Sequence, residues 1–199
     1  MTNTTKPILG ITGKARVGKD TFADILVDHY GFRKISFADP IRFAASHILG
    51  IPMDSLIDGP VKEQPLDWLD VTPRQFMQRF GTEFGRQMID PDIWLKYAQR
   101  RINTFLQDTT VNGIVISDVR FDNEAFFVRD QLSGSILQIV RPGSLSVNPH
   151  LSEAGLTEYT PDLYLVNDGS LDAFQAVTKT YGFGIACGIS IEQQQQTAA

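Results

Sequence analysis

The residues best suited to chemistry lie in the loop 13–21, whose sequence is GKARVGKDT. Its glycines allow backbone N–H groups to point toward a phosphate, and Lys19 can reach the outer phosphates of a nucleotide. An apolar run at 8–12 precedes the loop and a helix-like stretch at 22–30 follows it, so the positive end of a helix also faces the loop. This strand–loop–helix order predicts a phosphate-binding loop, and therefore an enzyme that uses a nucleotide.

The loop departs from the usual pattern at Asp20, which stands where Ser or Thr normally offers a hydroxyl to Mg²⁺. Either the Asp20 carboxylate serves the ion, directly or through water, or Thr21 takes over the role. The sequence leaves both open. The alternative for the whole loop is an ordinary turn with a solvated Lys19. Two glycines, two basic residues and a helix start in one short stretch disfavour that alternative.

Charged residues also follow the predicted strand 113–117, where Asp118 and Arg120 come directly after its last residue. Ligands of open α/β sheets bind beyond the carboxyl ends of the strands. An aspartate there can hold Mg²⁺ through water or polarise an attacking oxygen, and an arginine can clamp a phosphate. A structural ion pair between the two is the alternative. Glu124, early in the next helix, fits a helix-dipole partner or a solvated residue better than a ligand.

Arg141 ends another predicted strand and begins the segment 142–161. A basic residue where a lid begins can close over ATP phosphates and neutralise charge in the transition state. The same segment holds His150 and Glu153, which lack a third metal ligand at usable spacing, so a solvated or capping role is favoured for His150. The turn 167–170 either stacks a base or is a plain turn into the last helix.

The predicted helix 72–88 carries two unlike stripes. An apolar stripe is expected to face the core and comprises Phe76, Phe80, Phe84 and Met88. A second stripe places an arginine, an amide and two missing side chains on one side, at Arg74, Gln78, Gly81 and Gly85. Each glycine inside a helix costs about 1 kcal/mol relative to alanine, so something should approach that surface closely. A nucleotide lying across the helix and tight helix packing beside a solvated Arg74 explain the stripe equally well.

Apolar runs that alternate with longer helical segments must position these residues. The runs are 8–12, 33–37, 113–117, 136–140 and 163–166. This alternation predicts an α/β fold in three layers, with a mostly parallel central sheet and helices on both faces.

The sequence predicts helix starts at Thr72-Pro73 and at Asp90-Pro91. In each pair, a capping side chain precedes a proline at the first helical position. Asp122 and Ser170 are further predicted caps. The segments 50–70 and 142–161 show no sustained periodicity and are expected to leave the sheet as moving parts. The tail 192–199, rich in glutamine, is expected to be disordered.

Length and composition bound the class of protein. A chain of 199 residues fits one domain, and its net charge of −5 argues against a broad nucleic-acid-binding surface. The single cysteine, Cys187, fits a reducing compartment and a buried apolar role. Because no apolar run approaches membrane-spanning length and the start is polar, a cytoplasmic location without a membrane partner is expected.

Eight stretches in order over nearly the whole chain resemble one known family, the bacteriophage deoxynucleoside monophosphate (dNMP) kinases. The stretches are TGKARVGKDTFAD at 12–24, FADPIR at 37–42, RQFMQRFGT at 74–82, DPDIWLK at 90–96, DVRFDNE at 118–124, VRPG at 140–143, HLSEAGL at 150–156 and NDGSL at 167–171. The Gly-Lys-Asp-Thr form of the loop is usual in this family, so Asp20 is no anomaly there.

The resemblance implies the fold of a P-loop NTPase of the nucleoside monophosphate kinase type. One domain then covers 1–191, with an NMP-binding region at about 40–110 and a lid at about 142–161. ATP binding is implied for Gly13, Ala15, Arg16, Gly18, Lys19, Asp20, Thr21 and Arg141, with Mg²⁺ near Asp20 and Thr21. The dNMP pocket is implied for Arg42, Arg74, Gln78, Gly81, Thr82, Trp94, Asp118, Arg120 and Glu124. Catalytic roles are implied for Lys19, Arg74, Asp118 and Arg120.

Within that pocket Arg42 and Arg74 suit the substrate phosphate, and Trp94 suits stacking against or walling the base. Asp118 with Arg120 suits orientation of the acceptor near Mg²⁺. The segment 50–70 is shorter here than in family members that carry a larger insertion at this place. Because this region can line the pocket, the resemblance leaves the choice of base open.

The resemblance therefore implies transfer of the ATP γ-phosphoryl group to a dNMP, with these nucleotides as partners, no nucleic acid, and a homodimer as a family-based expectation. Two alternatives are a P-loop kinase for another small acceptor, such as dephospho-coenzyme A, and a nucleotide-binding switch without transfer chemistry. The switch is disfavoured because the chain has no Asn-Lys-x-Asp signature and its Asp118 segment lacks the Asp-x-x-Gly form.

Overall fold

The computed structural model describes residues 6–57, 59–143 and 155–186. The sequence-based predictions for His150, for Glu153, for Cys187 and for the tail 192–199 concern residues outside these ranges, and so does the part 144–154 of the predicted lid. Contacts between residues divide the chain into two compact units. The first comprises Met1–Ser36 and Gln99–Ala199, and the second is Phe37–Ala98.

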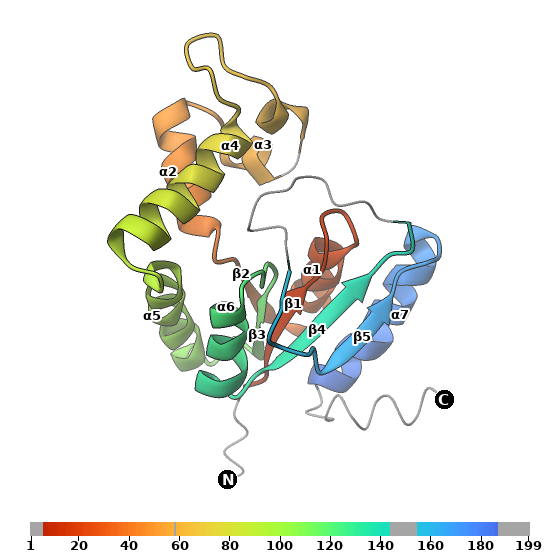
Figure 1. The fold of residues 1–199 in the computed structure, drawn as a ribbon. Helices are drawn as coiled ribbons and strands as arrows, with labels where there is room; N and C mark the ends of the chain where they lie inside the picture. Colours follow the sequence, from red (N-terminus) through yellow and green to blue (C-terminus); the bar gives the residue numbers. More distant parts are fainter. Residues whose placement is uncertain (1–5, 58, 144–154, 187–199) are drawn as a thin grey trace. The chain divides into compact units, whose positions relative to one another are not determined.

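The first unit is built on a five-stranded sheet in the order β2-β3-β1-β4-β5, in which every neighbouring pair is parallel. The strands, drawn in Figure 1, are β1 (Ile8–Thr12), β2 (Phe32–Ile35), β3 (Gly113–Ile116), β4 (Ser135–Val140) and β5 (Leu163–Val166). All five predicted runs are strands, with ends within two residues of the prediction. The predicted parallel α/β sheet is therefore confirmed.

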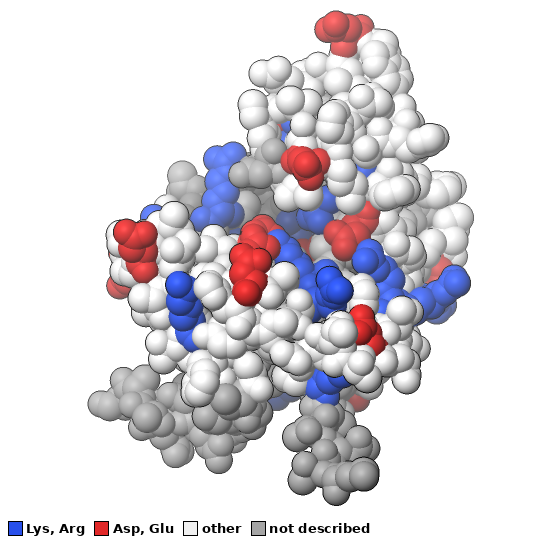
Figure 2. All heavy atoms as spheres, turned by 180° about the vertical axis from the view of Figure 1, so that it is seen from behind, with Lys and Arg blue, Asp and Glu red and all other residues white. Residues whose placement is uncertain are grey.

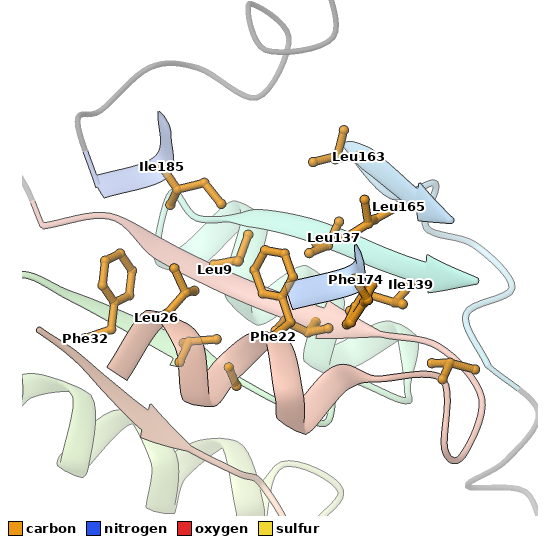
Figure 3. Packing of buried hydrophobic residues seen from close by; sticks show 14 residues of the cluster. Leu9, Phe22, Leu26, Phe32, Leu137, Ile139, Leu163, Leu165, Phe174 and Ile185 are labelled. Carbon is orange, nitrogen blue, oxygen red and sulfur yellow. The ribbon is translucent and has the colours of Figure 1, made fainter. Parts of the chain in front are cut away.

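Helices cover both faces of this sheet. Helices α1 (Lys19–Tyr30) and α7 (Leu171–Ala186) pack together on one face, where Phe22, Leu26 and Phe174 point toward the strands (Figure 3). The opposite face meets α6 (Asp122–Phe126) and the π-helix η3 (Phe127–Gln131), because a Cβ on Gly10 of β1 would touch Val128. Since successive strand residues alternate between the faces, the apolar runs of β1 and β4 serve both layers.

The second unit is helical. It contains α2 (Asp39–Leu49), α3 (Met53–Ile57), the 3₁₀-helix η1 (Pro60–Glu63), α4 (Pro73–Gln78), the π-helix η2 (Arg79–Ile89) and the first turns of α5 (Ile93–Gln107). A small core of its own joins α2 and α3 through Ala45, Leu49, Ile51 and Leu56, with Phe76 and Met77 of α4 packed against it.

The helix predicted at 72–88 begins as expected and then changes type. The Thr72 hydroxyl accepts from the Gln75 N–H at 3.1 Å and the Gln75 side chain accepts from the Thr72 N–H at 2.9 Å, a capping box. From Arg79 the chain is a π-helix, so the single α-helix prediction is wrong in its second half. The start predicted at Pro91 is two residues early, because Asp90 instead accepts from the Asp92 N–H in a turn before Ile93.

This change of helix type corrects the predicted core stripe. Phe76, Phe80 and Phe84 stack in series, with ring centroids 6.0 Å and 5.3 Å apart. Phe84 is nevertheless 44% exposed and Met88 73% exposed. The buried side of η2 carries Gly81, Thr82 and Gly85 instead, because i→i+5 hydrogen bonding rotates successive residues less per step than the α-helical spacing assumes.

The connection from β4 to β5 is fastened to α6 and η3 over residues 157–162. The Asp122 carboxylate accepts from the Thr157 N–H at 3.0 Å, the Thr157 hydroxyl at 2.5 Å and the Glu158 N–H at 3.0 Å. Arg129 donates to the Thr160 carbonyl at 3.1 Å. The prediction of Asp122 as a helix cap is therefore wrong, whereas Ser170 does cap α7 by accepting from the Ala173 N–H at 3.2 Å.

Acid is expected to weaken the Asp122 contact. Burial opposes ionisation of this carboxyl, yet the hydrogen bonds from Thr157 and Glu158 hold the pKa of Asp122 below its ordinary value of 3.8. The stabilisation is therefore fully present above pH of about 4 and is lost as pH falls through the lower, folded-state pKa. Asp122→Asn should lower the free energy of unfolding by about 1 kcal/mol near neutral pH, and by less at pH of about 3.

Urea denaturation at the two pH values measures this difference. Asp172→Asn is the matched control, because Asp172 also lies in the first turn of a helix, α7, and so shares the helix-dipole contribution. A loss that is the same at both pH values, or equal in the two variants, would contradict the role assigned to Asp122.

Candidate functional site

The loop between β1 and α1 follows the course that a phosphate-binding loop requires. Gly13 has φ of 135° and Gly18 has φ of 108°, both in the region that favours glycine. A Cβ on Gly13 would lie 2.4 Å from the Ile139 carbonyl oxygen, so only glycine allows the loop to begin this close to β4. Arg16, at φ of 62°, takes a left-handed conformation at the loop's tip. The loop is thus held against the carboxyl ends of the strands.

Lys19 is positioned by the loop itself. It is buried, and its Nζ donates to the carbonyl of Gly13 at 2.7 Å and to that of Lys14 at 2.6 Å. These bonds hold the ammonium against the first residues of the loop. Phosphate oxygens that entered the loop would compete with these two carbonyls for the ammonium, because anions form stronger hydrogen bonds to a charged donor.

Asp20 lies in the first turn of α1 and has a cationic neighbour that the sequence did not reveal. Lys34 of β2 is 2.8 Å from the Asp20 carboxylate and 2.9 Å from that of Asp24. Burial alone would lower the pKa of Lys34, but its hydrogen bonds to the two carboxylates outweigh burial and hold that pKa above its ordinary value of 10.5. The i, i+4 spacing of the two aspartates was the one available signal.

Asp118, Arg120 and Glu124 gather where β3 ends. Asp118 is buried and accepts a short hydrogen bond from the Ser36 hydroxyl, which lies just after β2. Glu124 is buried and accepts from the backbone N–H groups of Arg120 at 2.7 Å and Phe121 at 3.2 Å. Glu124 therefore shapes the turn in which Arg120 lies, the kind of helix-terminus role favoured from the sequence. Ser36 was missed because nothing in its surroundings marks it.

A cavity of about 280 Å³ opens beside the start of the loop. Its lining includes Gly13, Lys14, Arg120, Gln138 of β4 and Tyr164 of β5. Residues 155–161 contribute further lining. Arg141 follows directly after β4 and is exposed.

In the second unit, both arginines predicted to bind phosphate have carboxylate partners. The guanidinium of Arg74 contacts Glu63 through Nε at 2.7 Å and through a second nitrogen at 2.6 Å. Arg42 lies 3.3 Å from Asp39, one turn earlier in α2. Sequence reasoning missed both partners, although the i, i+3 spacing of the second pair was visible. Glu63 lies in the segment 50–70, which gave no pattern from which to infer the contact.

The glycine stripe of η2 is filled by side chains of its own unit. A Cβ on Gly81 would lie 2.7 Å from Ile41 Cδ1, and one on Gly85 would lie 2.4 Å from the Trp94 ring. The buried Trp94 also donates its indole N–H to the Gly81 carbonyl at 2.8 Å. Tight packing thus accounts for the missing side chains, although Arg74 is paired and not merely solvated.

Gln78, beside these glycines, has a buried amide nitrogen with no hydrogen-bond partner among the described residues. A buried donor without a partner costs free energy, and such groups are rare in folded proteins. The amide of Gln78 is therefore a candidate hydrogen-bond donor to a ligand. Thr82 is buried one turn further on.

Surface charge, helix hydropathy and possible metal ligands add three observations. On the face drawn in Figure 2, basic and acidic side chains lie interspersed. No helix in the described ranges is long and apolar enough to cross a membrane. Within the same ranges, no three histidine, cysteine or acidic side chains gather as a metal site.

Comparison with known proteins identifies the family. The family model for deoxynucleotide monophosphate kinase matches residues 63–177. A protein of Acanthamoeba polyphaga mimivirus named "Putative deoxynucleotide monophosphate kinase" is 34% identical over 178 residues, covering 84% of this chain and 91% of that protein. The chain belongs to the deoxynucleotide monophosphate kinase family.

The chain is also similar to one more named kinase and to one solved structure. The deoxynucleotide monophosphate kinase of Enterobacteria phage T4 is 32% identical over 100 residues, which are 50% of this chain and 40% of the phage protein. The solved dephospho-CoA kinase of Campylobacter jejuni aligns with a TM-score of 0.50 at 16% identity, covering 92% of this chain and 98% of that one. This second likeness concerns the fold, which is that of P-loop kinases.

The contact between Gly13 and β4 predicts how this family member tolerates alanine at two glycines. Gly13→Ala places a methyl group 2.4 Å from a backbone oxygen, whereas Gly143→Ala shares a positive φ of 77° but meets no atom of the described residues within 4 Å. Strain alone should cost Gly143→Ala about 1 kcal/mol of unfolding free energy, and strain plus the clash should cost Gly13→Ala about 3 kcal/mol. Urea denaturation measures the two losses of unfolding free energy. An ADP titration measures the affinity of Gly13→Ala for ADP, which should fall because the clash displaces the loop. Equal losses of stability, or unchanged ADP affinity in Gly13→Ala, would contradict it.

Proposed function

We propose that the chain transfers the γ-phosphoryl group of ATP to the 5′-phosphate of a deoxynucleoside monophosphate, giving ADP and a deoxynucleoside diphosphate. Membership of the family makes it a phosphotransferase with a phosphate acceptor. The observation that carries the proposal is the buried Lys19 ammonium at the start of a glycine-closed loop between β1 and α1. This arrangement suits the β- and γ-phosphates of a nucleoside triphosphate.

The donor site proposed for ATP is the loop with the start of α1. Backbone N–H groups of Ala15, Arg16, Gly18 and Lys19, with Asp20 and Thr21 beyond them, are assigned to the phosphates, and the N-terminus of α1 adds its dipole. Arg141, exposed at the end of β4, is assigned to the same phosphates from the lid. The range of that lid is proposed as about 142–161 within a kinase domain of 1–191.

The residues at the start of α1 fit Mg²⁺. This ion prefers oxygen ligands and is held in kinases through one or two carboxylates together with substrate phosphates. Asp20 offers a carboxylate in the first helical turn and Thr21 a hydroxyl beside it. Bound there, Mg²⁺ would neutralise charge on the phosphates. Lys34 already compensates part of the Asp20 charge, which limits repulsion of the triphosphate.

The residues assigned to the dNMP follow from the family resemblance and are given for each unit separately. In the unit Phe37–Ala98, Arg42 and Arg74 are assigned to the substrate phosphate and Gln78 to the base. Gln78 is chosen because its amide nitrogen lacks a partner among the described residues. Gly81, Thr82 and Trp94 are assigned to the same pocket. Gly81 acts there through its carbonyl, which accepts from the Trp94 N–H, so only the Trp94 ring is left for a base. In the first unit, Asp118, Arg120 and Glu124 are assigned to dNMP binding.

The transfer needs little covalent work from the protein. An oxygen of the acceptor phosphate attacks the γ-phosphorus, the bond from that phosphorus to the β–γ bridging oxygen breaks, and ADP leaves with the electron pair. The accepting phosphate is already an anion near neutral pH, so no general base is required. Lys19, Arg74 and Arg120 neutralise the charge that develops, while Asp118 orients the acceptor. Exclusion of water prevents hydrolysis of ATP.

Two further proposals concern where and in what form the enzyme works. We infer that it acts in the cytoplasm, which is the host cytoplasm if a phage encodes it, where ATP and dNMPs are available. A homodimer is proposed from the family resemblance alone. Light scattering at micromolar concentration distinguishes a dimer from a monomer.

Loss of the Lys19 ammonium tests the proposed function. Lys19→Met keeps the aliphatic stem and removes the charge, so ADP release dependent on dNMP should fall at least about 10³-fold while the melting temperature changes little. Lys179→Met, on an exposed lysine of α7, is the matched control and should keep full activity. The assay uses dTMP, dGMP, dCMP, dAMP, their ribose counterparts and dephospho-coenzyme A as acceptors. A fully active Lys19→Met, or turnover with dephospho-coenzyme A alone, would refute the assignment.

A further inference from the structure

Asn167 joins the end of β5 to the phosphate loop, 150 residues away in the chain. Its backbone N–H donates to the Val140 carbonyl at 2.8 Å, which extends the pairing of β4 with β5 by one step. The residue is only 5% exposed, and its side-chain Nδ2 donates to the Val17 carbonyl at 2.9 Å. From the sequence this asparagine belonged to a turn that either stacks a base or has no ligand role. The contact points to a third role.

The contact fixes one peptide plane of the loop. A trans peptide is planar, and its C=O and N–H point in opposite directions. When Asn167 draws the Val17 carbonyl toward β5, the N–H of Gly18 in the same peptide must point away from β5. The Val17 side chain is buried in the core cluster with Phe22 and Phe174, so the peptide is held on both sides.

The neighbours of this peptide fit the same arrangement. A Cβ on Gly18 would lie 3.0 Å from Asn167 Nδ2 and 2.8 Å from the Phe174 ring. Gly18 therefore allows the amide to approach the loop as well as allowing φ of 108°. Without the amide donor, the Val17 carbonyl would be left without this bond, and rotation of the peptide would become less costly.

We propose that Asn167 is a positioning residue that orients the Val17–Gly18 peptide so that the Gly18 N–H faces the bound phosphates. The proposal rests on the assignment of loop 13–21 to the phosphates of ATP. Asn167 then acts on the phosphates through the loop and has no contact with the base. Its removal should weaken every ligand that carries the polyphosphate, whether or not a base is present.

The test compares two asparagines that make the same bond. Asn167→Asp removes the amide donor with almost no change of shape. It also places a carboxylate oxygen next to the Val17 carbonyl oxygen, which it repels. Asn112→Asp is the matched control, because Asn112 Nδ2 donates to the Tyr30 carbonyl at 3.0 Å in the same unit, beyond the end of α1. The probes are ADP and inorganic tripolyphosphate in equilibrium titrations, and the steady-state KM values for ATP and dNMP. Melting temperatures report stability.

For Asn167→Asp, we expect the Kd values of ADP and of tripolyphosphate to rise by a similar factor of about tenfold, which corresponds to about 1.4 kcal/mol. The KM for ATP should rise with them, and the KM for dNMP should stay within about twofold. Asn112→Asp should lower the melting temperature without changing any of these constants. If the aspartate variant does not fold, Asn167→Ala, which adds no charge, gives the same readouts.

Three results would overturn the proposal. The first is weaker binding of ADP with unchanged binding of tripolyphosphate, which would assign Asn167 to the base. The others are equal changes of affinity in the two asparagine variants, or no change of affinity at all. Failure of the proposed kinase reaction is a separate outcome. It would be seen as wild-type protein that binds ADP without turning over any dNMP, and the binding titrations would still decide the role of Asn167.

Discussion

The close approach of the phosphate loop to the ends of the parallel strands is the constraint on which the rest of the site depends. Gly13 begins the loop against the Ile139 carbonyl of β4, and Val17 and the side chain of Asn167 hold its far side against β5. A loop clamped at both ends presents N–H groups in a fixed pattern, so little conformational entropy remains to be lost when a phosphate binds. In the proposed binding of ATP, the sheet therefore contributes by holding the loop in place.

Charge in this molecule is organised by pairing. Arg74 with Glu63, Arg42 with Asp39, and Lys34 with Asp20 each bring a cation to a carboxylate in a partly buried place. A cation left alone there would be costly, and a carboxylate partner offsets that cost. In the proposed reaction, oxygens of the substrate phosphate replace or share the carboxylate partners of Arg74 and Arg42, so substrate binding exchanges one anionic partner for another. Such an exchange favours ligands with several negative oxygens over neutral ones.

Much of this was predictable from the sequence, and what was not has physical reasons. The strands were found because buried parallel strands are continuous apolar runs, and the loop because a phosphate needs glycines and a lysine at set positions. The π-helix Arg79–Ile89 was not predicted, because the four-residue spacing of its apolar residues is also the spacing typical of an α-helix. Glu63, Lys34 and Ser36 were missed because their partners lie on other elements. Asn167 was noticed, but its target is a carbonyl 150 residues away.

Hydrogen–deuterium exchange with each nucleotide added separately tests the central claim, that one segment receives the donor and another the acceptor. With ADP, the amides in 13–21 should exchange more slowly, because their N–H groups become bonded to phosphate. With a dNMP alone, it predicts slower exchange in 73–89 and little change in 13–21. Protection of the loop by the dNMP and not by ADP, or no protection of the loop by ADP at saturation, would contradict the account.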